Sequence, residues 1–164
     1  MEPDWTPRLV DRPRATLVGV RQALSAGAST TAALWGRFMP RRHEIAHRVD
    51  ERLISLRVYH AVPPSALAAS TPFDEWAVAE VSEAGRVPSG MEALELRAGL
   101  YAVFVHRGPA AAFAATARWI YGTWLPASAY ALDGRPHLAV MGPGYRPDDP
   151  LAEEEVWIPV TPSP

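Results

Sequence analysis

The segment Ala33-Leu-Trp-Gly-Arg-Phe-Met-Pro40 has a counterpart later in the chain, Ala117-Arg-Trp-Ile-Tyr-Gly-Thr-Trp-Leu-Pro126. Each runs from an alanine through a tryptophan and a glycine to a proline, and each ends a stretch whose apolar residues recur at the spacing of a helix. Proline ends or interrupts a helix because it has no N–H and its ring clashes with the preceding turn. The sequence therefore predicts two related helices.

Segments rich in β-branched and apolar residues lie on either side of both helices. The first helix is predicted over 30–38, with Ser29 or Thr30 as its N-cap, and the second from Pro109 to Trp124. The predicted strands are 15–21, 54–60 and 76–81 around the first helix, and 92–97, 100–106, 137–141 and 154–158 around the second. The order β-α-β-β occurs twice, which predicts an α+β fold of two modules in a pseudo-twofold arrangement, with a cleft where they meet.

Length and composition indicate one domain of balanced charge. The chain has 164 residues, of which 48% are hydrophobic, enough for a single domain with its own core. Charged residues make up 21% and the net charge is −2. No basic stripe or arm is visible, so we expect no direct contact with nucleic acid.

The chain contains no cysteine, which excludes disulfides and thiolate metal sites and fits a reducing compartment. The N-terminal residues lack a basic start followed by an apolar segment, so no signal peptide is expected. No apolar run approaches the roughly 18 residues that cross a bilayer. We therefore expect a cytoplasmic protein without a membrane partner.

Six tryptophans and five tyrosines are many for so short a chain. Such large amphipathic side chains suit ligand pockets as well as cores, and core packing is the commoner use.

The segment His43-Glu-Ile-Ala-His47 matches H-E-x-x-H, in which two histidines one helical turn apart bind zinc and the glutamate activates a water. The longer zinc-protease motif needs a glycine where this chain has Asp50, and a third ligand follows it. Two histidines alone bind zinc weakly. We therefore expect no metal site here, but a solvated basic helix in which Glu44 and Arg48 form an i,i+4 pair.

Four stretches carry a resemblance to a known family: Leu34-Trp-Gly-Arg-Phe-Met-Pro-Arg-Arg42, Gly99-Leu-Tyr-Ala-Val-Phe-Val-His-Arg-Gly108, Tyr121-Gly-Thr-Trp-Leu-Pro126 and Glu153-Glu-Glu-Val-Trp-Ile-Pro-Val160. In this order they are similar to the GyrI-like family, which shares the effector-binding domain of AraC-type and MerR-type drug-responsive regulators. The resemblance implies one domain over 7–160, with two βαββ modules at about 9–82 and 91–160. It also implies an SHS2-like duplication, in which a curved antiparallel sheet with flanking helices surrounds a central ligand cleft. Residues 1–6 and 161–164 are then expected to be flexible termini.

Members of this family have three uses. Some are effector domains fused to a helix-turn-helix, some are free-standing drug-binding or toxin-protective proteins, and a subset hydrolyses the cyclopropane ring of DNA-alkylating antibiotics. The first predicted strand begins near residue 15, which leaves no room for a helix-turn-helix, so we expect a free-standing member. DNA gyrase as a partner and a homodimer both stay open.

The resemblance points to the last strand as part of the ligand site. Strand alternation puts Glu155 and Trp157 on one face, and Glu154 and Val156 on the other. In the family, a glutamate and an aromatic two residues apart face the cleft, and they match Glu155 and Trp157. A carboxylate beside an indole in an apolar cleft would have a raised pKa, suited to acid–base catalysis or to a cationic drug. The alternative is a rim carboxylate beside a core tryptophan.

The penultimate strand departs from the family's pattern. Effector domains that bind cationic drugs often carry a second glutamate there, in a pattern like H-F-E-V, where this chain has Ala139. A site with fewer buried anions attracts a strongly cationic ligand less. We therefore expect a neutral or weakly basic, flat aromatic ligand, with Ala139 and Met141 in the pocket wall.

Four aromatic residues complete the expected pocket. Tyr59 lies on the strand where the family carries an aromatic toward the cleft, and Trp35, Phe113 and Trp119 lie on the two helices that flank it. Phe113 shares the apolar stripe of its helix with Trp124, so one of these two is expected in the core. Trp119 lies off this stripe, which favours the cleft or the surface.

The leading interpretation is a binder of an amphipathic aromatic small molecule, in drug or toxin protection, without a cofactor or a metal. The first alternative is addition of water to an electrophilic cyclopropane, in which Glu155 activates the water and Tyr59 polarises the leaving carbonyl oxygen. The second alternative is modulation of a topoisomerase without a small ligand.

Overall fold

The computed structural model describes residues 5–25, 31–59 and 72–164. The strands in these ranges are β1 (Arg8–Arg12), β2 (Ala15–Ser25), β3 (Leu53–Tyr59), β4 (Pro72–Val81), β5 (Glu92–Leu96), β6 (Gly99–Arg107), β7 (Tyr130–Leu132), β8 (His137–Met141) and β9 (Glu153–Pro162). The helical segments are α1 (Thr31–Phe38), η1 (Met39–Glu44), η3 (Ala110–Ala112), α2 (Phe113–Trp119), η4 (Ile120–Trp124) and α3 (Leu125–Ala127). No helix in these ranges has both the length and the apolar character that crossing a membrane requires.

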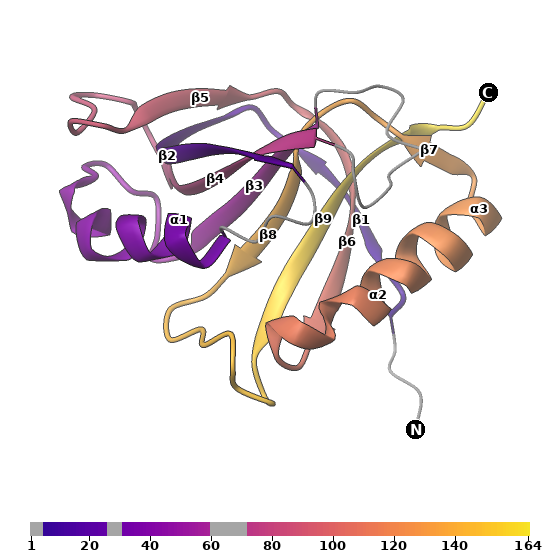
Figure 1. Ribbon diagram of the computed structural model, residues 1–164. Helices are drawn as coiled ribbons and strands as arrows, with labels where there is room; N and C mark the ends of the chain where they lie inside the picture. Colours follow the sequence, from indigo (N-terminus) through magenta and orange to yellow (C-terminus); the bar gives the residue numbers. More distant parts are fainter. Residues whose placement is uncertain (1–4, 26–30, 60–71) are drawn as a thin grey trace.

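The strands form one antiparallel sheet in the order β1-β6-β9-β8-β3-β4-β2-β5, and β7 pairs with β9 beside it. The units β2-α1-β3-β4 and β6-α2-β8-β9 occupy the two halves of this order and meet where β8 pairs with β3. Figure 1 shows α1 near one end of the curved sheet and α2 near the other end. The predicted α+β fold with a duplicated β-α-β-β order is therefore confirmed.

The sheet curls because strands that are distant in its order are joined by short links. Six strand-to-strand steps separate β1 from β2, and the same number separates β5 from β6. In a flat sheet these steps would span about 29 Å, whereas the two-residue links 13–14 and 97–98 each reach only about 10 Å. An ion pair between Arg12 on β1 and Glu80 on β4, at 2.6 Å, also joins the two halves across the interior of the curl.

One face of the sheet carries both helices. The paired residues Ala77, Ser55, Ala139, Val156 and Phe104 form a continuous row across β4, β3, β8, β9 and β6, so they share this face. Helix α1 packs at one end, where Leu34 and Phe38 contact strands β2 and β4. The helical stretch from η3 to α3 packs at the other end, where Ile120 of η4 contacts strands β6 and β9. We call this the helix-bearing face.

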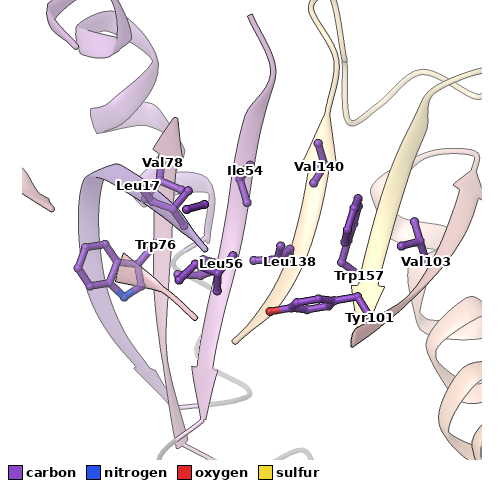
Figure 2. Close-up of a cluster of buried hydrophobic side chains, with 12 residues drawn as sticks. Leu17, Ile54, Leu56, Trp76, Val78, Tyr101, Val103, Leu138, Val140 and Trp157 are labelled. Carbon is purple, nitrogen blue, oxygen red and sulfur yellow. The ribbon is translucent and has the colours of Figure 1, made fainter. Parts of the chain in front are cut away.

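The opposite face lines the inside of the curl and is called the inner face. A second row of paired residues crosses it, namely Arg21, Trp76, Leu56, Leu138, Trp157, Val103 and Arg8. The apolar members of this row are buried in one cluster, and Figure 2 shows the indoles of Trp76 and Trp157 on either side of Leu56 and Leu138. Within residues 5–25, 31–59 and 72–164, the curl thus closes a core over a face to which neither α1 nor α2 contributes.

The structure differs from the local predictions in two respects. Strands β1 and β7 were not predicted, because both are short and pair at positions that only the folded sheet provides. Pro126 was expected to close the second helix, but the helix continues to Ala127. Proline removes one i→i−4 hydrogen bond, and the widened π-helical turn η4 directly before it accommodates that loss. The predicted N-cap, Ser29 or Thr30, lies outside the described residues.

Candidate functional site

A cavity of about 340 Å³ opens on the inner face, between the edge strand β1 and the central strands. Its apolar wall is made of Val10, Ile54, Val140 and Trp157. Its polar wall is made of Arg8, Arg12, Asp50, Arg52, Glu80 and Glu155, with Pro13 beside them. A second hollow of about 210 Å³ is formed within the loop and strand start at 142–153.

Glu155 and Trp157 lie next to each other in the cavity wall. The Trp157 Nε1–H donates to Glu155 Oε1 at 3.2 Å, and Arg8 Nη2 donates to Glu155 Oε2 at 2.7 Å. The guanidinium carbons of Arg8 and Arg12 lie 6.0 Å and 5.5 Å from the centre of the Trp157 ring. The carboxylate is therefore held at both oxygens, and the indole carries two cations within cation–π range.

The charges of the cavity wall are paired with one another. Besides Arg8 and Glu155, Arg12 Nη2 lies 2.6 Å from Glu80 Oε1. Arg52 Nε lies 3.0 Å from Asp50 Oδ2, and the Arg52 backbone N–H donates to the other oxygen of Asp50 at 2.9 Å. Each carboxylate of the wall therefore faces an arginine of the same wall, and the cavity presents apolar surface with a balanced set of charges.

Tyr59, Ala139 and Met141 lie on the helix-bearing face, not with Glu155. In the β8–β9 pairing, Val140 is opposite Glu155, whereas Ala139 is opposite Val156 and Met141 is opposite Glu154. The prediction that combined Tyr59 with Glu155 at one ligand is therefore corrected, because paired residues share a face and successive residues alternate. A glutamate at position 139 would likewise lie on the helix-bearing face and would not add a charge beside Glu155. The cavity wall uses its neighbour Val140 instead.

The three aromatic residues predicted on the helices pack between the helices and the sheet. Trp35 makes an edge contact with Phe38, with ring centres 5.5 Å apart. The ring centre of Trp119 lies 6.1 Å from that of Phe104 and 5.2 Å from that of Trp5. Phe113 and Trp124 both pack against the cluster around Phe104, so both contribute to the core. The structure therefore does not bring Trp35, Phe113 or Trp119 together with the cavity of Glu155.

The helix-bearing face carries a half-buried carboxylate at Glu154, opposite His106 on β6. Burial raises the pKa of the Glu154 carboxyl, and the nearby His106 and Arg57 oppose this rise. Burial, together with the charge of Glu154, also raises the pKa of Tyr145 to about 12. The raised carboxyl pKa of Glu154 therefore belongs to the helix-bearing face.

His137 is a buried histidine on the same face. Its Nδ1 lies 3.0 Å from the hydroxyl of Tyr121, and the ring packs edge-on against Tyr59 with centres 5.0 Å apart. Burial, with a smaller contribution from the charge of Arg57, lowers the pKa of His137 to about 3. The neutral ring shares one hydrogen bond with the Tyr121 hydroxyl through Nδ1, and burial raises the pKa of Tyr121 above its ordinary value.

Acid sensitivity of the fold is expected to depend on His137. In the unfolded chain His137 takes up a proton near pH 6.5, whereas in the folded chain it does so only near pH 3. The neutral, buried His137 therefore contributes stability that is fully present above pH 6.5 and is lost as the pH falls towards 3. Between about pH 7 and pH 5 the loss should be about 2 kcal/mol. Urea unfolding at both pH values should show a smaller loss for His137→Gln than for the native chain. His43→Gln, at an exposed position, is the control, and an equally steep loss in His137→Gln would contradict the assignment.

The H-E-x-x-H segment does not form the expected helix. The 3-10 turn η1 ends at Glu44, Ile45 is buried, and His47 has a positive φ of 63°. Glu44 pairs with Arg41 at 2.8 Å, not with Arg48, because the helix that would place Arg48 one turn away stops first. His47 Nε2 lies 3.3 Å from Glu83 Oε1. Within the described ranges, no three His, Asp or Glu side chains are grouped to hold a metal ion.

A comparison with protein families identifies the family of this chain. The family described as the GyrI-like small molecule binding domain matches residues 6–161, almost the whole chain. The chain belongs to the GyrI-like family. This confirms the family that the four sequence stretches indicated, and it supports a small molecule as the ligand of this GyrI-like domain.

A curated relative of the GyrI-like domain is the transcriptional regulator BrlR of Pseudomonas aeruginosa PAO1. The two sequences are 32% identical over 154 residues, which cover 93% of this chain and 54% of BrlR. The chain therefore spans about half the length of this relative.

Solved structures share the fold. SAV2435 bound to tetraphenylphosphonium has a TM-score of 0.73 at 14% identity, covering 98% of this chain and 94% of SAV2435. The C-terminal domain of EcmrR has a TM-score of 0.73 at 13% identity, with 98% and 100% covered. A hydrolase encoded by lin2189 from Listeria innocua has a TM-score of 0.59 at 11% identity, with 97% and 93% covered. At these identities the likeness shows the fold of the GyrI-like domain alone.

Trp76 and Asp74 form a second acid–tryptophan pair on the inner face of the GyrI-like domain, which was not predicted from the sequence. Trp76 pairs with Leu56 as Trp157 pairs with Leu138, so the two indoles occupy equivalent places in the two halves. Asp74 precedes Trp76 by two residues, as Glu155 precedes Trp157. The repeated pattern acid-x-Trp, at the last strand of each β-α-β-β unit, is the sequence signal that would have identified this pair.

Proposed function

We propose that this GyrI-like domain binds a flat, uncharged or weakly basic aromatic molecule in the cavity beside Glu155 and Trp157. The ligand would be a drug or toxin against which the protein protects. The observation that carries the proposal is a cavity of about 340 Å³ that combines an apolar wall with an indole and a carboxylate. Its size falls within the range of small-molecule sites, which are mostly apolar with a few polar groups. BrlR, as a transcriptional regulator, supports a role in sensing such molecules.

The charge balance of the wall supports an uncharged ligand. Burying a charged group is costly unless it gains a partner, and the carboxylates of this wall already face arginines. An uncharged aromatic molecule leaves these ion pairs intact and gains contact with Val10, Val140 and the Trp157 ring. Ala139 has no part in this charge balance, because it lies on the other face.

Acridine, neutral at mildly alkaline pH, is a suitable probe for this proposal. Val10 lines the cavity, whereas Leu9 precedes it on β1 and points to the helix-bearing face. Val10→Trp should fill part of the cavity and weaken acridine binding by about tenfold or more, equivalent to about 1.4 kcal/mol. Leu9→Trp introduces the same side chain on the same strand and should leave the affinity within about threefold.

Calorimetric titration of acridine into the native chain and both variants measures this difference. Saturable binding that is lost only in Val10→Trp supports the cavity as the site. Equal weakening by Leu9→Trp and Val10→Trp, or the absence of saturable binding to the native chain, overturns the proposal. Thermal unfolding of both variants checks that each has folded.

Ring-opening hydrolysis is the second candidate function, and the observation in its favour is a carboxylate in the cavity wall. In that reaction the water oxygen bonds to a cyclopropane carbon, a ring C–C bond breaks, and a proton reaches the oxygen of the conjugated carbonyl. Glu155 would take the water proton. Its two oxygens already accept hydrogen bonds from Arg8 and Trp157, and Tyr59 lies on the opposite face. Binding without turnover is therefore the better supported function.

Mass spectrometry of a duocarmycin-type spirocyclopropane incubated with the protein separates the two functions. We expect the compound to be recovered unchanged with both the native chain and Glu155→Gln. A product one water heavier, formed beyond one equivalent by the native chain and absent with Glu155→Gln, would make the protein a hydrolase with Glu155 as its base.

A further inference from the structure

The Glu155 carboxylate and the Trp157 ring together have the composition of a subsite for an organic cation. A carboxylate supplies a charge-assisted hydrogen bond, and the face of an indole attracts a cation through its quadrupole. In this structure both groups are already used by Arg8. Its Nη2 lies 2.7 Å from Glu155 Oε2, and its guanidinium carbon lies 6.0 Å from the centre of the Trp157 ring.

Arg8 comes from the edge strand β1, 147 residues before Glu155 in the chain. The side chain of Arg8 is 52% exposed, whereas that of Arg12, the other cation over Trp157, is 12% exposed and bound to Glu80. Exposed ion pairs contribute little net free energy, because the charges remain partly solvated and two long side chains must be ordered. Arg8 is therefore the cation that can be removed from this subsite without disturbing the packing beneath it.

The other half of the domain repeats this arrangement from different residues. Arg21 lies with its guanidinium carbon 5.8 Å from the centre of the Trp76 ring, and its Nη1 lies 3.5 Å from Asp74 Oδ2. In each half, then, an arginine of the chain spans a carboxylate and the tryptophan two residues after it. Arg21 lies on β2 directly opposite Trp76 and also pairs with Glu92 at 3.1 Å, so its contact is similar to that of Arg8 but comes from a different strand position.

We propose that Arg8 is a specificity-determining residue that occupies the cation subsite of Glu155 and Trp157 and so restricts the cavity to uncharged ligands. This proposal rests on the proposed function, because it concerns the same cavity. An organic cation must displace the guanidinium to reach the carboxylate, whereas an uncharged ring needs no such exchange. Removing the charge of Arg8 should therefore favour cations over uncharged molecules in this cavity.

Acridine and 10-methylacridinium test this proposal, since they are nearly the same size and differ by one fixed positive charge. In Arg8→Gln, the ratio of the affinity for 10-methylacridinium to that for acridine should rise by about tenfold. Arg14→Gln is the matched control, because Arg14 forms an exposed pair with Glu95 away from the cavity. The double variant Arg8→Gln/Glu155→Gln should lose the gain, because the anion that attracts the cation is gone.

Calorimetric titration distinguishes failure of this proposal from failure of the proposed function. If acridine binds the cavity and Arg8→Gln gives no gain for 10-methylacridinium over acridine, the role of Arg8 is wrong and the binding function stands. An equal gain in Arg14→Gln would also overturn the role of Arg8, since it would reflect net charge alone. If neither probe binds any variant, the proposed function and this inference both fail.

Discussion

Gly19→Ala is expected to destabilise the fold by about 3 kcal/mol or more, and to lower the melting temperature by roughly 10 °C. Gly19 lies in β2, between β4 and β5. A Cβ at this position would lie 1.9 Å from the carbonyl oxygen of Ala77 and 2.7 Å from the Cα of Val78. Both are backbone atoms of the neighbouring strand, so the overlap is relieved only if β2 and β4 separate.

Gly36→Ala is the matched control and should change stability in the opposite direction. Gly36 is exposed within α1, and a Cβ there would have no neighbour within 4 Å. Alanine lowers the conformational entropy of the unfolded chain and favours the helix, so a gain of about 0.5–1 kcal/mol is expected. Thermal and urea unfolding measure both variants. Unchanged stability in Gly19→Ala would contradict the close approach of β2 and β4 at this position.

Leu56→Ala is expected to cost between about 2 and 5 kcal/mol of unfolding free energy. Leu56 is fully buried in the inner face and pairs with Trp76 on one side and Leu138 on the other, as Figure 2 shows. Removing its branched end leaves a void among strands that are hydrogen-bonded on both sides and cannot collapse around it. Urea unfolding at constant pH measures the loss.

Leu138→Ala tests the pseudo-twofold relation, because Leu138 holds the equivalent place beside Trp157. Its cost should agree with that of Leu56→Ala within about 1 kcal/mol. Leu151→Ala is the control, since Leu151 is 87% exposed, and it should change stability by less than about 0.5 kcal/mol. A loss in Leu138→Ala no larger than the control would show that the two halves do not share the inner core as described.

The helices and the duplication were accessible from the sequence because they depend on local patterns. The apolar spacing around Leu34 and Phe38, and the proline near the end of each helical stretch, indicated helices at the right places. Alternating apolar residues indicated the central strands. Both signals arise from the fixed periods of helix and strand, which hold for any chain segment whatever its neighbours.

The candidate site was accessible only in part. Alternation along β9 correctly separates Glu155 and Trp157 from Glu154 and Val156, because successive side chains in a strand point to opposite faces. It gives no information on which residue of another strand shares a face with Glu155. Tyr59 was grouped with Glu155 by resemblance alone, and the pairing of β3 with β8 places it on the opposite face.

What the sequence by itself determined is therefore the class of fold, its duplication, and the partition of residues along each strand. The tertiary structure alone decided the pairing register, in which a shift of one residue moves a whole strand's side chains to the other face. It also decided the curl, since two-residue links draw the far ends of the sheet together and bury the inner face. For the same reason Arg8 meets Glu155 across 147 residues, a contact that no local pattern encodes.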